Sequence, residues 1–205
     1  MRTILLTLCL FMGTILSAQN NVLIEIENAN AAYKVITGDF VRTQTNVAKG
    51  TSIKADGTLY IVGEDQMAQY YKAPSTDLLI INGNDFYMIR GKKTNKFNTE
   101  KNKTMRSLRN TLLYCVHGKP MELATENGAE ITAEKKANEY EVVLISTKKT
   151  ARGYAKIVLT YDLKSKLLTK MQMDEYNGNS TLYEMNNLKT NGNIDAKMFD
   201  IPEKK

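Results

Sequence analysis

The chain of 205 residues carries a formal net charge of +6, from 28 Lys and Arg against 22 Asp and Glu. Its one His and two Cys supply too few ligands for an ordinary metal site and too few thiols for a disulfide framework. No Gly-x-Ser-x-Gly motif, P-loop or dinucleotide-binding fingerprint is present, so we expect neither a metal nor a cofactor, and enzyme chemistry has little support.

The first eighteen residues are typical of a secretory signal peptide. After a short basic start, the run Ile4–Leu16 is apolar, and Ser17-Ala18 supplies small residues for cleavage. The apolar run is too short to span a membrane comfortably. We therefore expect a signal peptide over 1–18, cleaved near Ala18, followed by one domain over 19–205 of an exported protein.

Two amphipathic helices are expected. Apolar residues over 22–36 recur at three- and four-residue steps, and Gly38 is a plausible stop for this helix. The second helix is expected over about 104–117, and Pro120 marks its end. His117 then lies near the carboxyl end of the helix, where a positive charge is favoured.

The rest of the chain has the patterns of β-strands separated by short turns. The expected strands occupy 38–45, 57–62, 67–72, 78–81, 86–89, 140–147, 154–161, 167–173 and 181–188. Neighbouring strands joined by short turns must pair antiparallel, because parallel pairs need long crossover connections. We therefore expect an α+β fold in which helices pack on one large curved antiparallel sheet.

The segment LLIINGNDFYMIRG (78–91) contains the strongest hairpin signal. If Asn82-Gly83 is a two-residue loop, Leu79 pairs with Phe86. One face of this hairpin carries Leu79, Ile81, Phe86 and Met88, and the other carries Leu78, Ile80, Tyr87 and Ile89. A sheet with one wet face alternates polar and apolar residues, so both faces here must be covered or must bind something. We expect the second face to pack under the first helix.

Cys115 and His117 are the residues closest to a catalytic pair. Cys9 leaves with the signal peptide, so Cys115 is the one cysteine of the mature chain and has no intramolecular partner. Residues two positions apart do not share a helix face. A small hydrolase using Cys115 therefore ranks below the other interpretations.

A strongly basic segment runs from residue 90 to residue 109. A patch of this kind attracts anionic surfaces such as phospholipid headgroups or acidic protein faces, although a solvated loop has the same composition. Nucleic acid is not an expected partner, because export separates the chain from it. The candidates for docking on a membrane or exporter are Arg90, Lys92, Lys93, Lys96, Lys101, Lys103, Arg106 and Arg109.

Four motifs follow one another in a characteristic order. They are GDFVRTQT at 38–45, GTLYIV with MAQYYKAP at 57–74, LLIINGNDFYMI at 78–89 and NGNIDAKMFDIP at 191–202. The positions that carry the pattern are Phe40, Gly57, Leu59, Pro74, Asn82, Gly83, Tyr87, Asn191, Gly192, Asp195, Phe199 and Pro202. In order and spacing these motifs resemble the periplasmic lipoprotein carrier family, LolA, over most of the mature chain.

The resemblance implies a fold as well as a site. The fold is an incomplete antiparallel β-barrel, a large curved sheet with a lid of α-helices over an apolar cavity. Adaptable side chains such as Met suit a cavity that must hold acyl chains and also release them. The residues assigned to this lipid-binding cavity are Leu59, Ile61, Met67, Tyr71, Leu79, Ile81, Phe86, Met88, Ile157, Leu159, Met171 and Met173 from strands, with Leu108, Leu112 and Val116 from the lid.

The resemblance also implies a function and partners. It indicates a monomeric periplasmic chaperone that takes acylated lipoproteins from an inner-membrane exporter to the outer membrane, with an outer-membrane receptor as a further candidate partner. The family usually has Arg-Pro after the second strand, and that Arg is implicated in opening the cavity; Gly63-Glu64 stands here instead. This departure keeps an alternative open, an envelope sensor that binds a lipid or lipoprotein and signals through a partner.

Overall fold

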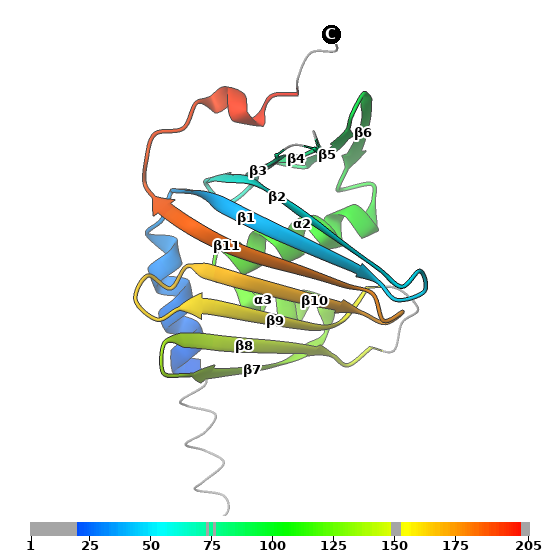
Figure 1. Cartoon of the computed structure of the whole chain (residues 1–205). Helices are drawn as coiled ribbons and strands as arrows, with labels where there is room; N and C mark the ends of the chain where they lie inside the picture. Colours follow the sequence, from blue (N-terminus) through cyan, green and yellow to red (C-terminus); the bar gives the residue numbers. More distant parts are fainter. Residues whose placement is uncertain (1–19, 73, 76, 149–152, 202–205) are drawn as a thin grey trace, which may run out of the picture.

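The computed structural model describes residues 20–72, 74–75, 77–148 and 153–201 (Figure 1). The predicted signal peptide and Pro202 of the last motif lie outside the described residues. Within the described part of the chain, no helix is long and apolar enough to cross a membrane.

Eleven strands form one antiparallel sheet in the order β6-β5-β4-β3-β2-β1-β11-β10-β9-β8-β7. Because β6 and β7 are its two edges, the sheet is curved but not closed, which confirms the predicted incomplete barrel (Figure 1). The strands are β1 Val35–Asn46, β2 Thr51–Val62, β3 Gln66–Tyr71, β4 Leu78–Asn82, β5 Asp85–Arg90, β6 Lys93–Asn98, β7 Ala129–Lys135, β8 Glu139–Ser146, β9 Tyr154–Asp162, β10 Leu168–Glu175 and β11 Ser180–Thr190.

Helices cover one face of this sheet. They are an N-terminal helix over 20–31, α2 over Lys103–Val116 and α3 over Pro120–Asn127. The side chain of Asn102 caps α2 by accepting a hydrogen bond from the backbone N–H of Met105 at 3.0 Å. The second predicted helix is therefore confirmed to within a residue at each end.

The prediction for the first helix is wrong at its end. The helix stops at residue 31, and Ile36 and Gly38 belong to β1, which pairs with β2 on one side and β11 on the other. Gly38 serves close packing instead of ending a helix, because a Cβ there would lie 2.6 Å from Cδ2 of Leu188. Pairing on both sides of β1 outweighs the helical spacing of the apolar residues.

One α-helix and two strands were not predicted from the sequence. Pro120 begins α3 instead of only ending α2, since a first-turn position needs no backbone donor. The strands β6 and β7 are the two edges of the sheet, and their sequences, KTNKFN and AEITAEK, are polar. Polar, charged edge strands resist pairing with other chains, but in a sequence they look like loops.

The β4–β5 hairpin forms with a different register from the predicted one. Its two-residue loop is Gly83-Asn84, so Leu79 lies opposite Met88 and Ile81 opposite Phe86. Gly83 takes a positive φ of 58°, as this loop requires. Each partner shifts by two residues, an even number, so the predicted membership of the two faces is unchanged.

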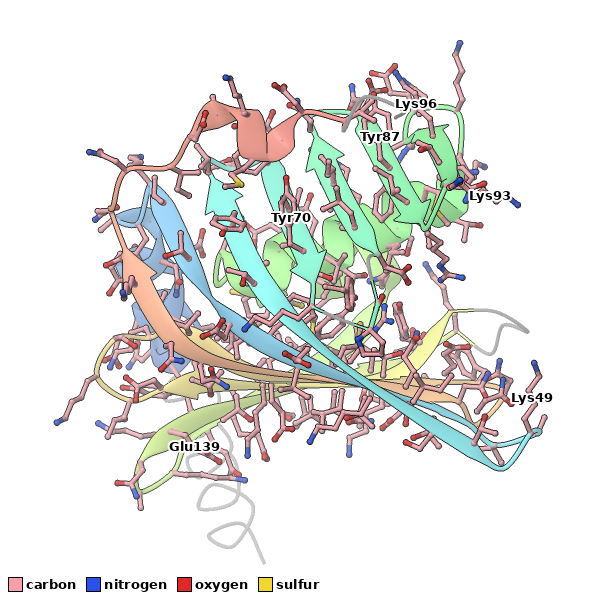
Figure 2. The ribbon with its side chains drawn as sticks, turned by 45° about the horizontal axis from the view of Figure 1, so that its top comes forward. Lys49, Tyr70, Tyr87, Lys93, Lys96 and Glu139 are labelled. Atoms are coloured by element: carbon pink, nitrogen blue, oxygen red, sulfur yellow. The ribbon has the colours of Figure 1, made fainter. Side chains whose placement is uncertain are left out.

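The outer face of the hairpin is covered by the C-terminal segment, and the prediction that the first helix covers it is wrong. The 3-10 helix η1, Ala196–Phe199, places Phe199 against β3 and β4. The Tyr70 hydroxyl donates to the Met198 carbonyl at 2.9 Å; Figure 2 turns this face forward. The buried outer cluster consists of Ala68, Leu78, Ile80, Tyr87, Ile89 and Phe199.

Candidate functional site

The concave face of the sheet and the helices enclose one apolar interior. All the residues that were assigned to a cavity from the sequence lie in this single cluster, with Met88 and Leu108 at its half-buried margin. Strands from both halves of the sheet contribute, because alternate residues of each strand point to the same face. The structure therefore brings these side chains together, from β2–β5, β9, β10 and α2.

Several residues of this interior were missed. Phe40 on β1 packs edge-on against the Tyr71 ring at 5.0 Å between centroids, and it also meets Tyr183 on β11 at 6.1 Å. A Cβ at Gly57 would lie 2.7 Å from the Phe40 ring, so glycine leaves room for that ring. The signal that could have found Phe40, Tyr183 and Met185 is period-two alternation along β1 and β11.

The interior is almost completely filled. Two small voids lie between the strands and α2, each about 10 Å³, and both are lined in part by Leu59 and Val116. A water molecule alone needs roughly 10–15 Å³. Neither void has room for an acyl chain, so in the described part of the chain a ligand would enter this space as the helices moved away from the sheet.

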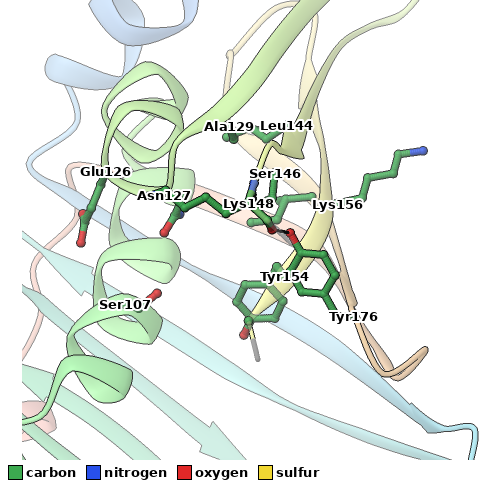
Figure 3. A pocket seen from close by; sticks show the side chains of 12 residues that line it. Ser107, Glu126, Asn127, Ala129, Leu144, Ser146, Lys148, Tyr154, Lys156 and Tyr176 are labelled. Atoms are coloured by element: carbon green, nitrogen blue, oxygen red, sulfur yellow. Dashed lines mark hydrogen bonds between the residues drawn. The ribbon is translucent and has the colours of Figure 1, made fainter. Parts of the chain in front are cut away.

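A hollow of about 210 Å³ opens at one end of the interior, between the helices and the sheet. Figure 3 shows Ser107 from α2 on one side and Tyr154 and Lys156 from β9 on the other. Leu144 and Ile157, which also line it, belong to the apolar interior. This hollow is therefore the place where the interior reaches the surface beside the helices.

A larger hollow, on the outer face, is a different kind of surface. It measures about 700 Å³ and lies on the outer face, under the segment that leads to η1. Its walls include Asp39, Asn187, Lys189 and Asp195, and Asp39 is already paired with Lys72 at 3.2 Å. A polar, open groove of this kind does not match an apolar ligand, so the interior is the better candidate site.

Polar groups interrupt the interior at one level. The Arg42 guanidinium carbon lies 4.6 Å from the centre of the Tyr71 ring. The Tyr71 hydroxyl donates to Oε1 of Gln69 at 3.3 Å, and burial raises the pKa of Tyr71, so the hydroxyl keeps its proton. Gln69 is only 3% exposed. Arg42, Tyr71 and Gln69 together are called the polar band below.

The helices are tied to the sheet by a few polar contacts. Glu64, which follows β2, forms an ion pair with Lys119 at 3.0 Å, just before α3. The Arg109 Nε donates to the Gly83 carbonyl at 2.8 Å, and the Tyr161 hydroxyl donates to the Cys115 carbonyl at 2.9 Å. Apolar packing supplies the rest of the contact between the helices and the sheet.

Cys115 and His117 do not form a catalytic pair. The Cys115 thiol is fully buried, and burial raises its pKa, so a reactive thiolate is disfavoured. Burial, with a smaller contribution from Lys119, lowers the pKa of His117 to about 4. His117 is therefore neutral at neutral pH, and the predicted favourable cation at the helix end is wrong, because burial outweighs the helix dipole.

The basic segment divides into two groups. Lys96 pairs with Asp85 at 2.8 Å, Arg106 donates to the Thr99 carbonyl at 2.9 Å, and Arg109 holds the β4–β5 loop. These three stabilise the junction of β5, β6 and α2. Figure 2 shows Lys93 and Lys96 on this edge of the sheet. The other five are called the exposed group below, although Lys96 and Arg106 are also exposed while they make the contacts above: Arg90, Lys92, Lys93, Lys101 and Lys103.

Comparison with known proteins matches a family model described as outer membrane lipoprotein carrier protein LolA to residues 31–202. A LolA superfamily protein from Nitrosomonas europaea is 9% identical, with 90% of this chain and 98% of that chain covered and a TM-score of 0.45. A putative outer membrane lipoprotein-sorting protein domain from Vibrio parahaemolyticus is 13% identical, with 90% and 97% covered and a TM-score of 0.48.

A DUF1329 family protein from Desulfovibrio piger is 10% identical, with 88% of this chain and 95% of that chain covered and a TM-score of 0.49. A search of curated proteins finds no match. Likenesses to solved structures at this level say nothing about what the chain binds.

Proposed function

We propose that this chain, which belongs to the LolA family of outer membrane lipoprotein carrier proteins, carries acylated lipoproteins through the periplasm from an inner-membrane exporter to the outer membrane. The observation that carries the proposal is the continuous apolar interior between the concave face and the helices. No covalent chemistry is needed for this function. Binding and release of acyl chains are sufficient.

The physical need for such a carrier follows from the hydrophobic effect. An acyl chain gains about 0.8 kcal/mol for each buried CH₂ group, so a chain of sixteen carbons left in water costs on the order of 12 kcal/mol. A lipoprotein carries more than one such chain. A carrier must therefore offer a large apolar surface and still give the chains up at the receiving membrane.

The filled interior suits both requirements. Leu112 and Val116 of α2 occupy the space between the helices and the strands, where an acyl chain would lie. When the helices move, an incoming chain replaces apolar contacts with apolar contacts, so opening and loading offset one another. The hollow beside Tyr154 and Ser107 is the route by which a chain would reach this space.

The exposed group of the basic segment supports a docking role. Arg90, Lys92 and Lys93 lie at the β5–β6 turn, and Lys101 and Lys103 precede or begin α2. A juxtamembrane basic residue contributes about 1 kcal/mol near an anionic surface. This edge would meet an anionic membrane or an acidic face of the exporter, next to the helix that must move.

A pull-down tests the proposal. Tagged mature protein is mixed with one lipoprotein in its acylated form and in a form lacking acyl chains, and the recovered amounts are compared. We expect at least ten-fold more of the acylated form, because a single buried chain dominates the binding free energy. Equal recovery of both forms would contradict the proposal.

A deletion strain separates the carrier from an envelope sensor. Loss of a carrier leaves outer-membrane lipoproteins in the inner membrane, whereas loss of a sensor changes only the stress response. Fractionation of the two membranes, followed by detection of one resident outer-membrane lipoprotein, decides between these functions.

A further inference from the structure

Arg42 is a cation at the margin of an apolar interior, and no described carboxylate pairs with it. It points to the concave face from β1, with Ala55 of β2 and Tyr183 of β11 as its neighbours in register. Its Nε is buried and has no hydrogen-bond partner. Among the ion pairs of the described residues, none involves Arg42.

The face of the guanidinium is occupied, but its buried Nε is not hydrogen-bonded. The Tyr71 ring lies against the guanidinium at 4.6 Å, which orients the planar group without using its N–H groups. A buried donor without a partner lowers stability. Arg42 is therefore arranged to donate a hydrogen bond to an oxygen atom that the described residues do not supply.

Gln69 provides a second, weakly paired donor in the same band. Its Oε1 accepts a hydrogen bond from the Tyr71 hydroxyl, while its Nε2 donates to the Met67 sulfur at 3.8 Å, and sulfur is a weak acceptor. Gln69 also lines one of the small voids, beside Leu112 and Met171. Gln69 therefore borders the space that an acyl chain would occupy.

Acyl chains carry oxygen atoms that need such donors. The chain itself requires an apolar interior, but a buried carbonyl or carboxylate oxygen without a partner costs free energy. We propose that Arg42 and Gln69 form a polar subsite that donates hydrogen bonds to the acyl oxygens of the ligand, while the hydrocarbon fills the interior. This inference rests on the proposed function and adds a chemical requirement to it.

Two sources share this chemistry. The oxygens can be the ester carbonyls that join acyl chains to a lipoprotein, or the carboxylate of a free fatty acid. An arginine fork donates to either, and Tyr71 holds it at the level where the apolar interior ends. The experiment below therefore uses one probe of each source and one probe without acyl oxygens.

The test measures dissociation constants for three probes by calorimetry. They are a synthetic lipopeptide with two ester-linked hexadecanoyl chains, the same peptide with ether-linked hexadecyl chains, and hexadecanoate. The variants are Arg42→Met, Arg42→Lys and the control Lys54→Met, which removes an exposed charge from β2 outside the docking edge. We expect Arg42→Met to weaken binding of the ester lipopeptide, of hexadecanoate or of both roughly ten-fold, and to weaken binding of the ether peptide less than two-fold.

The outcomes separate the inference from the proposed function. If Arg42→Met loses affinity only for the ester peptide, the subsite serves lipoproteins. If it loses affinity only for hexadecanoate, the subsite serves free fatty acids. Either result supports the subsite. If the dissociation constants of the ester and ether peptides change equally, or do not change, the subsite is overturned. The carrier function still stands in that case, provided that the wild-type protein binds the probes. Failure of the wild-type protein to bind any probe would overturn the carrier function.

Arg42→Lys keeps the test decisive if Arg42→Met does not fold. Lysine retains the charge but not the planar fork, so we expect a smaller selective loss than with methionine. Lys54→Met should leave all three dissociation constants within two-fold of the wild-type values. A loss of affinity in Lys54→Met equal to that in Arg42→Met would show a general charge effect and contradict the subsite.

Discussion

The two faces of the β4–β5 hairpin are both apolar, but the fold covers them with different elements. Ile81 and Phe86 face the interior beneath α2, where they join a cluster that spans the whole sheet. Ile80 and Tyr87 face outward and are covered by the C-terminal segment through Phe199. The same alternating sequence therefore builds a candidate binding interior on one side and a small, closed contact on the other.

The elements that cover the two faces differ in how readily a ligand could displace them. On the inner face, the inner cover is α2, which places Leu112 and Val116 against the strands. Small voids remain in this contact, and a hollow opens at its end. The outer cover is Phe199, 4% exposed, with Ile194 and Met198 half-buried against the same cluster and a hydrogen bond from the Tyr70 hydroxyl to the Met198 carbonyl. We infer that ligand can replace the inner cover and that the outer cover only stabilises the fold.

Phe199→Ala should have the largest effect on stability. It removes the contact between the C-terminal segment and the outer face of the hairpin, and it leaves the inner face unchanged. Removing a buried phenylalanine costs about 4 kcal/mol in the free energy of unfolding, which urea denaturation measures. Ile201→Ala, at an exposed neighbour, is the control and should stay within about 0.5 kcal/mol. If Phe199→Ala also weakened hexadecanoate binding by the folded protein, the two faces would not be functionally separate.

Leu112→Ala should cost about 3 kcal/mol, but this loss should be partly restored by ligand. The substitution enlarges a void on the inner face, and an acyl chain can fill it. We expect saturating hexadecanoate to raise the melting temperature of Leu112→Ala by more than it raises that of Phe199→Ala. Equal increases for both variants would contradict an exchangeable inner cover.

His117 should make the helix side of the molecule sensitive to mild acid. Its pKa is about 4 when folded, below the usual 6.5, so the unfolded chain binds the proton more readily. Neutral His117 makes its full contribution to the free energy of unfolding above pH 6.5. This contribution decreases as the pH is lowered, and the loss reaches about 2 kcal/mol at pH 5. Unfolding by urea from pH 7 to pH 5 measures this loss.

His117→Gln is the control for this pH dependence, because glutamine does not titrate. Its unfolding free energy should change much less over the same range. Carboxylates with lowered pKa values, such as Asp85 beside Lys96 and Glu25 beside Lys166, lose their stabilising effect only at lower pH. A slope that persists in His117→Gln would show that another group carries it.

Glu64→Gln should have the smallest effect. The Glu64–Lys119 pair connects the strand side to the helices, but the Glu64 side chain is 80% exposed, so the pair contributes only a few tenths of a kcal/mol. We expect a melting temperature lower by about 1 °C at low salt, and no difference from wild type in 1 M salt. A difference that persists at high salt would mean that Glu64 acts through packing.

The inner face was predictable because its signal is local. Met171 and Met173 alternate with Lys170, Gln172 and Asp174, and a strand with period two must put the two methionines on one side. An even shift in hairpin register does not change which face a residue occupies. The edge strands and α3 were missed because polar edge sequences resemble loops and because Pro120 suits both the end and the start of a helix.

The polar subsite was not predictable in the same way. Sequence alone identifies Arg42 and Gln69 as polar residues in strands, separated by a third strand. Gln69 shares a face with Tyr71 because the two are two residues apart on β3, but only the strand order β3-β2-β1 brings Arg42 to the Tyr71 ring. That no carboxylate among the described residues pairs with Arg42 is likewise a property of the packed neighbours and not of the local sequence.

The sequence by itself determined the α+β class, most strands, the helix that covers the sheet and the inward set of apolar side chains, because side-chain periodicity follows from backbone geometry. The tertiary structure decided which element covers each face, where His117 and Cys115 become buried, and which donors remain unused. Those properties depend on contacts between residues far apart in the chain. Phe199 against the hairpin and Arg42 against Tyr71 are the clearest cases.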